Sequence, residues 1–166
     1  MSEILPEYCD NKSVGVIIEN EDGAIALLQR ARFPVGIAPP AGHIDAHGSP
    51  EEAAVAEVGE ELGIVVAIEG LRKTIIEGRR IDNLCRRVGG DHHEWWVFEA
   101  NEPKSELKPS PDETKSAGWH DRTRLQELAK RTRAFRAGRI PEAEWEADPG
   151  LEELWLDFFV ELGYVE

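Results

Sequence analysis

The segment GHIDAHGSPEEAAVAEVGEELGI, residues 42–64, combines a glycine-bearing loop with a short helix. Ser49 can cap this helix, Pro50 suits its first position, and Glu52 completes a capping box. Gly63 marks its end, as a glycine after the last helical turn usually does. The segment therefore predicts a helix that is defined at both ends by its own sequence.

The predicted helix has an apolar face and an acidic face. At about 100° per residue, one side carries an aliphatic stripe: Val55, Val58 and Leu62. The opposite side carries three carboxylates within roughly 100° of each other: Glu57, Glu60 and Glu61. Carboxylates this close repel one another unless a cation lies among them, and oxygen ligands suit Mg²⁺ or Mn²⁺. A solvated acidic face is the alternative, because charged helix faces are common.

The same segment resembles the Nudix box, a motif of the form G-x5-E-x7-R-E-U-x-E-E-x-G-U in which U is aliphatic. Seven of its nine fixed positions match without a gap over 23 residues. The matching residues are Gly42, Glu57, Val58, Glu60, Glu61, Gly63 and Ile64. Two positions depart from the motif, because Gly48 replaces a glutamate and Ala56 replaces an arginine. The resemblance is close over the box and looser from about residue 13 to about residue 130.

Resemblance to the Nudix family implies an α/β fold (α+β) of the α/β/α sandwich type, with a mixed sheet between helices. It also implies a hydrolase that cleaves a nucleoside diphosphate linked to another group. Water would attack a phosphorus, with Mg²⁺ or Mn²⁺ as the cofactor. The implied metal ligands are Glu57, Glu60, Glu61 and the backbone carbonyl near Ala41.

The family commonly places a further acid in a loop that corresponds to residues 101–116 here. Asp112 and Glu113 are the candidates, and the general base is expected to be Glu57 or one of this pair, with Glu113 preferred. The departures at Ala56 and Gly48 leave a second interpretation open. The protein could be a Nudix-fold binding or regulatory module that holds a nucleotide with little or no catalysis.

Basic and aromatic residues outside the box are candidates for substrate contact. For Arg30 and Arg32, phosphate contact and a surface position are equally open. The main basic patch contains Arg79, Arg80, Arg86 and Arg87. We predict substrate contact for Arg79 and Arg80, and base stacking for Trp96. The alternatives are a solvent-facing sheet edge for the arginines and simple packing for the tryptophan.

Composition limits the possible partners and compartments. The chain has 166 residues, 41% of them hydrophobic, which suits one domain with a sizeable core. The net charge of −14 argues against non-specific nucleic-acid or membrane binding, which depends on basic patches. Two cysteines give no disulfide framework, and the N-terminus lacks the pattern of a signal peptide. A cytoplasmic enzyme acting on a small molecule is the expectation.

Along the chain, hydrophobic patterning predicts a single domain, residues 1–166, with a loosely held arm at 1–12. Strands are expected at 14–18, 24–29, 64–68, 71–76 and 92–100, the first two as a hairpin. Resemblance to the family implies a further short strand at 117–120. In the strand at 92–100, one face should meet the core and the other the ligand. Asp121 is expected to cap a helix that runs to about residue 137.

A C-terminal helical extension is expected within residues 138–166, with Asp148 and Pro149 at its start. Its apolar stripe consists of Leu151, Leu154, Trp155, Phe158, Phe159 and Leu162. A stripe this rich must be covered, either by the rest of the domain or by a second subunit in a homodimer.

A zinc site is not expected. Cys85, His92 and His93 are close in sequence, but their spacing fits no zinc pattern and a fourth ligand is not evident. His43 and His47 carry further imidazoles, and nothing in the sequence brings them to that group.

Overall fold

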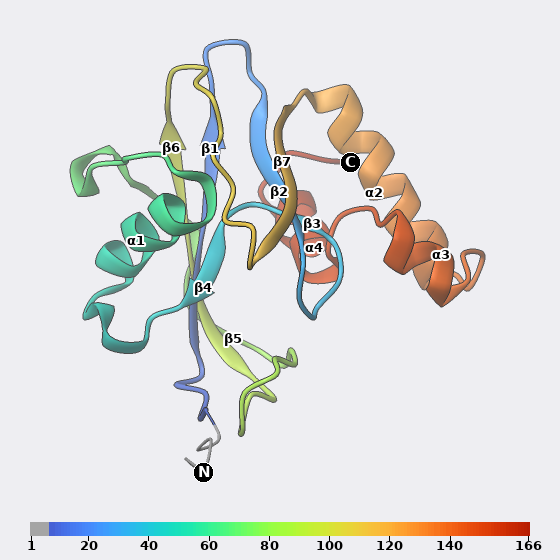
Figure 1. The fold of residues 1–166 in the computed structure, drawn as a ribbon, viewed down its shortest axis with the longest axis horizontal. Helices are drawn as coiled ribbons and strands as arrows, with labels where there is room; N and C mark the ends of the chain where they lie inside the picture. The colour runs from blue at the N-terminus through green and yellow to red at the C-terminus, as the bar shows by residue number, and fades with distance from the viewer. Residues whose placement is uncertain (1–6) are drawn as a thin grey trace.

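The computed structural model describes residues 7–166, and it contains a seven-stranded mixed sheet (Figure 1). The strands are β1 (Lys12–Glu19), β2 (Ile25–Arg30), β3 (Ile37–Ala38), β4 (Ala41–His43), β5 (Arg72–Ile81), β6 (His93–Asn101) and β7 (Thr114–His120). The main order is β3-β2-β1-β6-β5, while β4 pairs with β1 and β7 pairs with β2. β1 and β6 are parallel, and the other pairs are antiparallel.

Helices cover both faces of the sheet, which gives the predicted α/β/α sandwich (Figure 1). The helices are α1 (Pro50–Leu62), α2 (Arg122–Arg136), α3 (Glu142–Ala147) and α4 (Glu153–Glu161), with short 3-10 turns at Asp45–His47 and Ile68–Gly70. α1 lies on one side, and α2, α3 and α4 lie on the other. None of these helices in residues 7–166 is long and apolar enough to cross a membrane.

The central strands feed two hydrophobic clusters because successive side chains point to opposite faces. On β1, Val14, Val16 and Ile18 join the cluster that contains α1, while Ile17 joins the cluster that contains α4. β6 divides in the same way, with Trp95 and Val97 toward α4 and Phe98 toward α1. The prediction that one face of β6 meets the ligand is therefore wrong, since both faces pack on a core.

Two predicted elements differ from the structure, and one helix of the structure was not predicted. Residues 64–67, part of the strand expected at 64–68, join no sheet in the described chain, although Ile64 and Val66 are buried beside α1. The C-terminal helix begins at Glu153 rather than at Asp148, because residues 149–152 run beside β3, where Leu151 bridges Ile37. The helix α3 precedes it and was not predicted. The hairpin of β1 and β2 and the Asp121 cap of α2 agree with the predictions.

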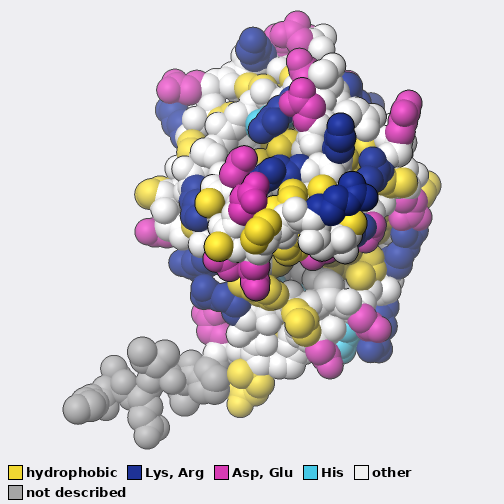
Figure 2. Space-filling view, turned by 90° about the vertical axis from the view of Figure 1, so that its right-hand side faces the viewer, with side chains coloured by type: hydrophobic (Ala, Val, Ile, Leu, Met, Phe, Trp, Pro, Cys, Tyr) yellow, Lys and Arg dark blue, Asp and Glu magenta, His cyan; other side chains and the backbone are white. Residues whose placement is uncertain are grey.

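The apolar stripe of the C-terminal segment is covered by its own domain. Leu151, Trp155, Phe158 and Phe159 are buried against the sheet and α2. Figure 2 shows the solvent side of the C-terminal helices, where acidic and basic side chains are interspersed. Arg136, for example, pairs with Asp157 at 2.9 Å and with Glu153 at 3.3 Å. The stripe therefore gives no reason to expect a second subunit.

Residues 7–11, part of the expected N-terminal arm, are hydrogen-bonded to the β5–β6 connection. The Cys9 N–H donates to the Val88 carbonyl at 2.8 Å, and the Val88 N–H donates to the Glu7 carbonyl at 2.9 Å. The Asn11 side-chain amide donates to the Gly89 and His92 carbonyls, both at 2.8 Å. Residues 1–6 lie outside the described part of the chain.

Candidate active site

Local sequence fixes the helix α1, as predicted. The Ser49 hydroxyl accepts from the Glu52 N–H at 3.1 Å, and the Glu52 carboxylate accepts from the Ser49 N–H at 3.1 Å. The Gly63 N–H closes the last turn on the Gly59 carbonyl. The packing stripe differs slightly from the prediction, because Val55 is half-buried and alanines fill its place. The buried apolar residues of α1 are Ala53, Ala54, Val58 and Leu62.

Two of the three acids on α1 point into the protein toward β4. Glu61 is 4% exposed, and its carboxylate accepts the Ala41 N–H at 3.1 Å. The Glu57 carboxylate lies against the α-carbon of Gly42, where an added Cβ would stand 2.3 Å from the carboxyl carbon. A glycine at position 42 is therefore needed to seat Glu57. Glu60 is exposed and approaches Glu57 from the solvent side.

The β6–β7 loop brings a third carboxylate to this pair. Oxygen atoms of Glu57, Glu61 and Glu113 all lie within 4.8 Å of one another. The loop is attached to the end of α1, since the Lys108 N–H donates to the Leu62 carbonyl at 2.8 Å. The Glu113 carbonyl accepts the Ala31 N–H at 3.0 Å, which holds the loop against the end of β2. The structure thus places Glu113 with two acids of α1.

Burial and mutual repulsion disfavour negative charge on this cluster. Burial, followed by the charges of Glu61 and Glu60, raises the pKa of Glu57. Burial also raises the pKa of Glu61, although the positive charge of Arg30 and the Ala41 N–H act in the opposite direction. A divalent cation among the three carboxylates would remove this repulsion, and carboxylate oxygens are the ligands that Mg²⁺ and Mn²⁺ prefer.

The carboxylates open onto a cavity of about 470 Å³. One side of the cavity carries the carboxylates of Glu57, Glu61 and Glu113, together with Ala41 and Gly42. Its other walls carry four arginines: Arg30, Arg32, Arg86 and Arg87. Carboxylates that suit a cation and guanidinium groups that suit phosphates therefore line the same cavity.

Comparison with known proteins identifies the fold and the family. Residues 10–142 match the NUDIX domain family. The chain belongs to the Nudix family. It is a Nudix-type hydrolase that acts on phosphoric anhydride bonds. A search of curated proteins finds no match.

Solved structures of Nudix proteins resemble the chain over most of its length. The MutT protein from Methanosarcina mazei Go1 has 20% identity and a TM-score of 0.61, and the match covers 98% of this chain and 96% of that chain. A MutT NUDIX hydrolase from Burkholderia pseudomallei has 28% identity over 68% of this chain and 84% of that chain, with a TM-score of 0.53. The C. elegans Ap4A hydrolase has 23% identity over 76% of this chain and 98% of that chain, with a TM-score of 0.52.

The two departures from the Nudix box have local explanations. Gly48 has a φ of 97°, in the left-handed region, and an added Cβ would stand 2.5 Å from a carboxylate oxygen of Glu52. The backbone at this position therefore favours glycine. The hydrogen bonds of the capping box connect the loop to the helix in place of the missing glutamate. Ala56 leaves the box without its own arginine. Arg30 supplies a positive charge beside Glu61 from another element.

Three predicted substrate contacts lie away from the lining of the cavity. Arg79, on β5, pairs with Glu161 of α4, and Arg80 pairs with Asp82 at 3.4 Å. Trp96 packs against the hydrophobic cluster around α1. Their part in binding substrate stays a prediction that the cavity does not support.

The alternation of side chains along β2 could have predicted from sequence that Arg30 reaches the site. Ala26 and Leu28 of β2 face α1, so Arg30, two residues further, faces the same side. The Arg30 Nε is buried and has no hydrogen-bond partner among the described residues. A buried guanidinium nitrogen without a partner, next to three carboxylates, is suited to meet an anionic ligand.

Proposed function

We propose that the protein is a metal-dependent pyrophosphohydrolase that cleaves a nucleoside diphosphate linked to another moiety. The observation that carries this proposal is the convergence of Glu57, Glu61 and Glu113 within 4.8 Å at the wall of the cavity. The family membership supports it, because Nudix hydrolases generally use a divalent metal.

The oxygen donors present fit Mg²⁺ or Mn²⁺. Glu57 and Glu61 would hold the ion, and Glu60 and the Ala41 carbonyl are further candidate ligands. When bound, the metal polarises the phosphate and lowers the pKa of the attacking water.

The side chains around the ion divide the remaining work. Arg30 and Arg32, which line the cavity near the end of β2, would orient the phosphate groups of the substrate. Arg30 also balances the charge of Glu61, the task that the missing arginine of the box would have shared. Glu113 stands beside the metal ligands without belonging to α1, and it would accept the proton of the attacking water.

A binding or regulatory module is the second candidate, because the changes at Ala56 and Gly48 weaken the box. Loss of a partner that orients a ligand commonly costs 10- to 100-fold, roughly, in metal affinity or activity. Nucleotide binding without turnover would follow if Arg30 does not replace that partner.

The deciding experiment is product analysis by ion-exchange chromatography with a panel of substrates. The panel contains nucleoside triphosphates, nucleotide sugars, ADP-ribose and dinucleoside polyphosphates, the last class suggested by the Ap4A hydrolase. Each is incubated with Mg²⁺, with Mn²⁺ and with chelator. Metal-dependent cleavage of one class, lost by at least about 100-fold in Glu61→Gln, supports the hydrolase. Binding in a thermal-shift assay without any cleavage would favour the module.

A further inference from the structure

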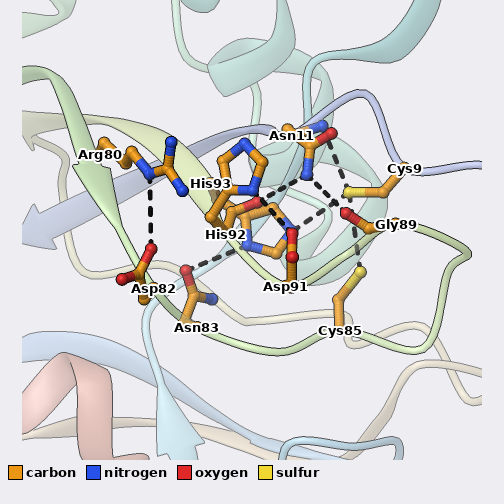
Figure 3. Close-up of polar contacts among 10 residues, drawn as sticks. All are labelled: Cys9, Asn11, Arg80, Asp82, Asn83, Cys85, Gly89, Asp91, His92 and His93. Carbon is orange, nitrogen blue, oxygen red and sulfur yellow. Dashed lines mark hydrogen bonds and ion pairs between the residues drawn. The ribbon is translucent and has the colours of Figure 1, made fainter.

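A second group of potential metal-binding side chains adjoins the carboxylate cavity, whose lining includes two of its members, His43 and Cys85. Three stretches that are distant in sequence contribute to it: one carries Cys9, one carries His43, and one carries both Cys85 and His93. One ligand atom from each residue lies within 4.8 Å of the other three. Figure 3 shows Cys9, from the N-terminal segment, and Cys85, from the β5–β6 connection, beside His93 at the start of β6. His43, the last residue of β4, completes the group.

The spacing of the ligand atoms agrees with tetrahedral coordination. The two sulfur atoms are 3.7 Å apart, and the Cys9 sulfur is 3.2 Å from the His93 Nε2. With Zn–S of about 2.3 Å and Zn–N of about 2.0 Å, a tetrahedron places two sulfurs about 3.8 Å apart and a sulfur and a nitrogen about 3.5 Å apart. Small adjustments of the side chains would therefore accommodate an ion.

A hydrogen-bond network presents the free lone pair of His93 to this centre. The Trp95 Nε1–H donates to the Asn83 Oδ1 at 3.2 Å, which identifies that atom as the amide oxygen. The His93 Nδ1 lies 3.0 Å from the same oxygen and must donate a proton to it. The His93 Nε2 is then unprotonated and faces Cys9. A metal-bound histidine is typically fixed by such a hydrogen bond from its other nitrogen.

His43 presents a buried nitrogen that lacks a partner. Its Nε2 makes no hydrogen bond with the described residues, although the atom is shielded from solvent. Its ring lies edge-on to His93, with 5.5 Å between the ring centroids. A buried polar atom without a partner is costly, and coordination to an ion would satisfy it.

Backbone amides surround the two sulfur atoms. The Asn11 N–H donates to the Cys9 sulfur at 3.3 Å, and the Arg87 N–H donates to the Cys85 sulfur at 3.4 Å. Donors of this kind stabilise negative charge on a sulfur ligand. The Cys85 N–H also donates to the Gly90 carbonyl at 2.8 Å, which closes the loop around the centre.

We propose that Cys9, His43, Cys85 and His93 bind a structural zinc ion. Two thiolates and two imidazoles are a ligand set that favours Zn²⁺ over the hard cations that suit the carboxylate cluster. Four protein ligands leave no open position, so the site is structural rather than catalytic. Binding releases the two thiol protons and leaves both cysteines reduced. The proposal does not depend on which substrate the enzyme cleaves.

The zinc ion would connect the active site to the N-terminal segment. His43 follows Gly42, which seats Glu57, and Cys85 precedes Arg86 and Arg87, which line the cavity. The ion would therefore fix both the end of β4 and the loop that carries two arginines. Arg87 is further held by Asp45, at 2.7 Å.

The test is the metal content of the full chain, purified under reducing conditions with any polyhistidine tag removed. We expect about one zinc per chain, measured by mass spectrometry of the metal, and less than about a tenth of that in Cys85→Ser and His93→Gln. His92→Gln is the matched control, because His92 is the sequence neighbour but bonds to Asp91, at 2.7 Å, outside the group. It should retain the zinc of the wild type, as should Glu61→Gln.

Wild-type protein provides a readout that does not require the variants to fold. Substitution by Co²⁺ should give the visible absorption of a tetrahedral ion with thiolate ligands, and bound zinc should slow the reaction of both cysteines with a chromogenic thiol reagent. Equal zinc in wild type and His93→Gln would overturn the proposal. Failure of the reduced wild type to bind added Zn²⁺ or Co²⁺, or a Cys9–Cys85 disulfide in the purified protein, would overturn it as well.

Discussion

Arg30 is the residue on which the atypical Nudix box depends most. It lies at the end of β2 in the lining of the cavity, and its charge acts on both Glu61 and Glu152. We propose that this guanidinium, although it comes from a different element, replaces the arginine that the box lacks at Ala56. The box and the strand therefore have to be considered together as one site.

Replacing Arg30 tests this compensation. We expect Arg30→Met to lower kcat/KM or metal affinity by about 10- to 100-fold, because it removes a charged partner of the metal ligands. Arg79→Met is the matched control, since Arg79 pairs with Glu161 outside the cavity, and its activity should stay within about twofold of wild type. Steady-state kinetics across a Mg²⁺ titration separates a loss of kcat/KM from a loss of metal affinity. Equal losses in both variants would contradict the role of Arg30.

Glu152 should make the stability of the protein depend on pH. It is 7% exposed, and burial raises the pKa of its carboxyl from 4.5 to about 7 against the opposing charge of Arg30. The wild type is therefore expected to lose stability as the pH rises from 4.5 to about 7, because only the unfolded chain ionises freely in this range.

Glu152→Gln should remove this loss. Its stability relative to wild type should rise by up to about 3 kcal/mol between pH 4.5 and pH 7 and then stay constant. The measurement is urea unfolding at a series of pH values with constant metal. Glu142→Gln, at an exposed position, should follow the wild-type curve. A stability difference that does not change with pH would show that Glu152 ionises normally.

The proximity of two site residues could be predicted from sequence where both lie on the same helix. Glu57 and Glu61 share one helix, so their approach follows from the helical period alone. The proximity of Cys9 and His43 to Cys85 could not be predicted, since it depends on the pairing of β1 with β4 and on the course of the β5–β6 connection. Distances of this kind are set by the whole sheet.

At the level of elements, the β6–β7 loop distinguishes two adjacent acids. Its contacts with α1 and β2 bring Glu113 to Glu57 and Glu61, the proposed metal ligands, while Asp112 is exposed. Glu113→Gln is expected to lower kcat by about 100-fold or more, as loss of a general base does. Asp112→Asn should have less than about a twofold effect. Single-turnover kinetics with the best substrate of the panel provides the comparison, and a larger loss in Asp112→Asn would reassign the base.

The helix α4 is an integral part of the core rather than an appendage. Trp155 is fully buried and packs edge-on against Trp95 and Phe158, with ring centroids 5.9 and 5.2 Å apart. Trp155→Ala should cost about 3–5 kcal/mol in the free energy of unfolding. Val65→Ala, at a side chain that is 92% exposed, should cost less than about 0.5 kcal/mol. Urea unfolding of both variants tests this, and a small cost at Trp155 would mean that α4 detaches readily.

Elements were predicted well where local signals at their ends are strong. Ser49 and Asp121 cap α1 and α2 as expected. The start of α4 was misplaced, because Asp148 and Pro149 resemble a cap while Leu151 is drawn into a bridge with Ile37. Residues 64–68 form a continuous apolar run, as many buried strands do, but they pair with no strand in the described chain.

For the whole molecule, the two hydrophobic clusters are not independent. β1, β2 and β6 contribute side chains to both clusters, so neither face can unfold without exposing the other. We expect a single transition in urea, with the same midpoint by far-UV circular dichroism and by tryptophan fluorescence. An earlier loss of the fluorescence signal would show that the face around α4 opens separately.

The parallel pairing of β1 with β6 also affects how the protein is made. Val14 lies opposite Trp96, and the buried Trp155 comes still later in the chain. On the ribosome, β1 therefore emerges long before its central partner, and the face that α4 covers stays open until residues 151–165 have left the exit tunnel. Apolar strands exposed for that time are substrates for chaperones. Slow codons downstream of β6 would lengthen that exposure without changing a single side chain.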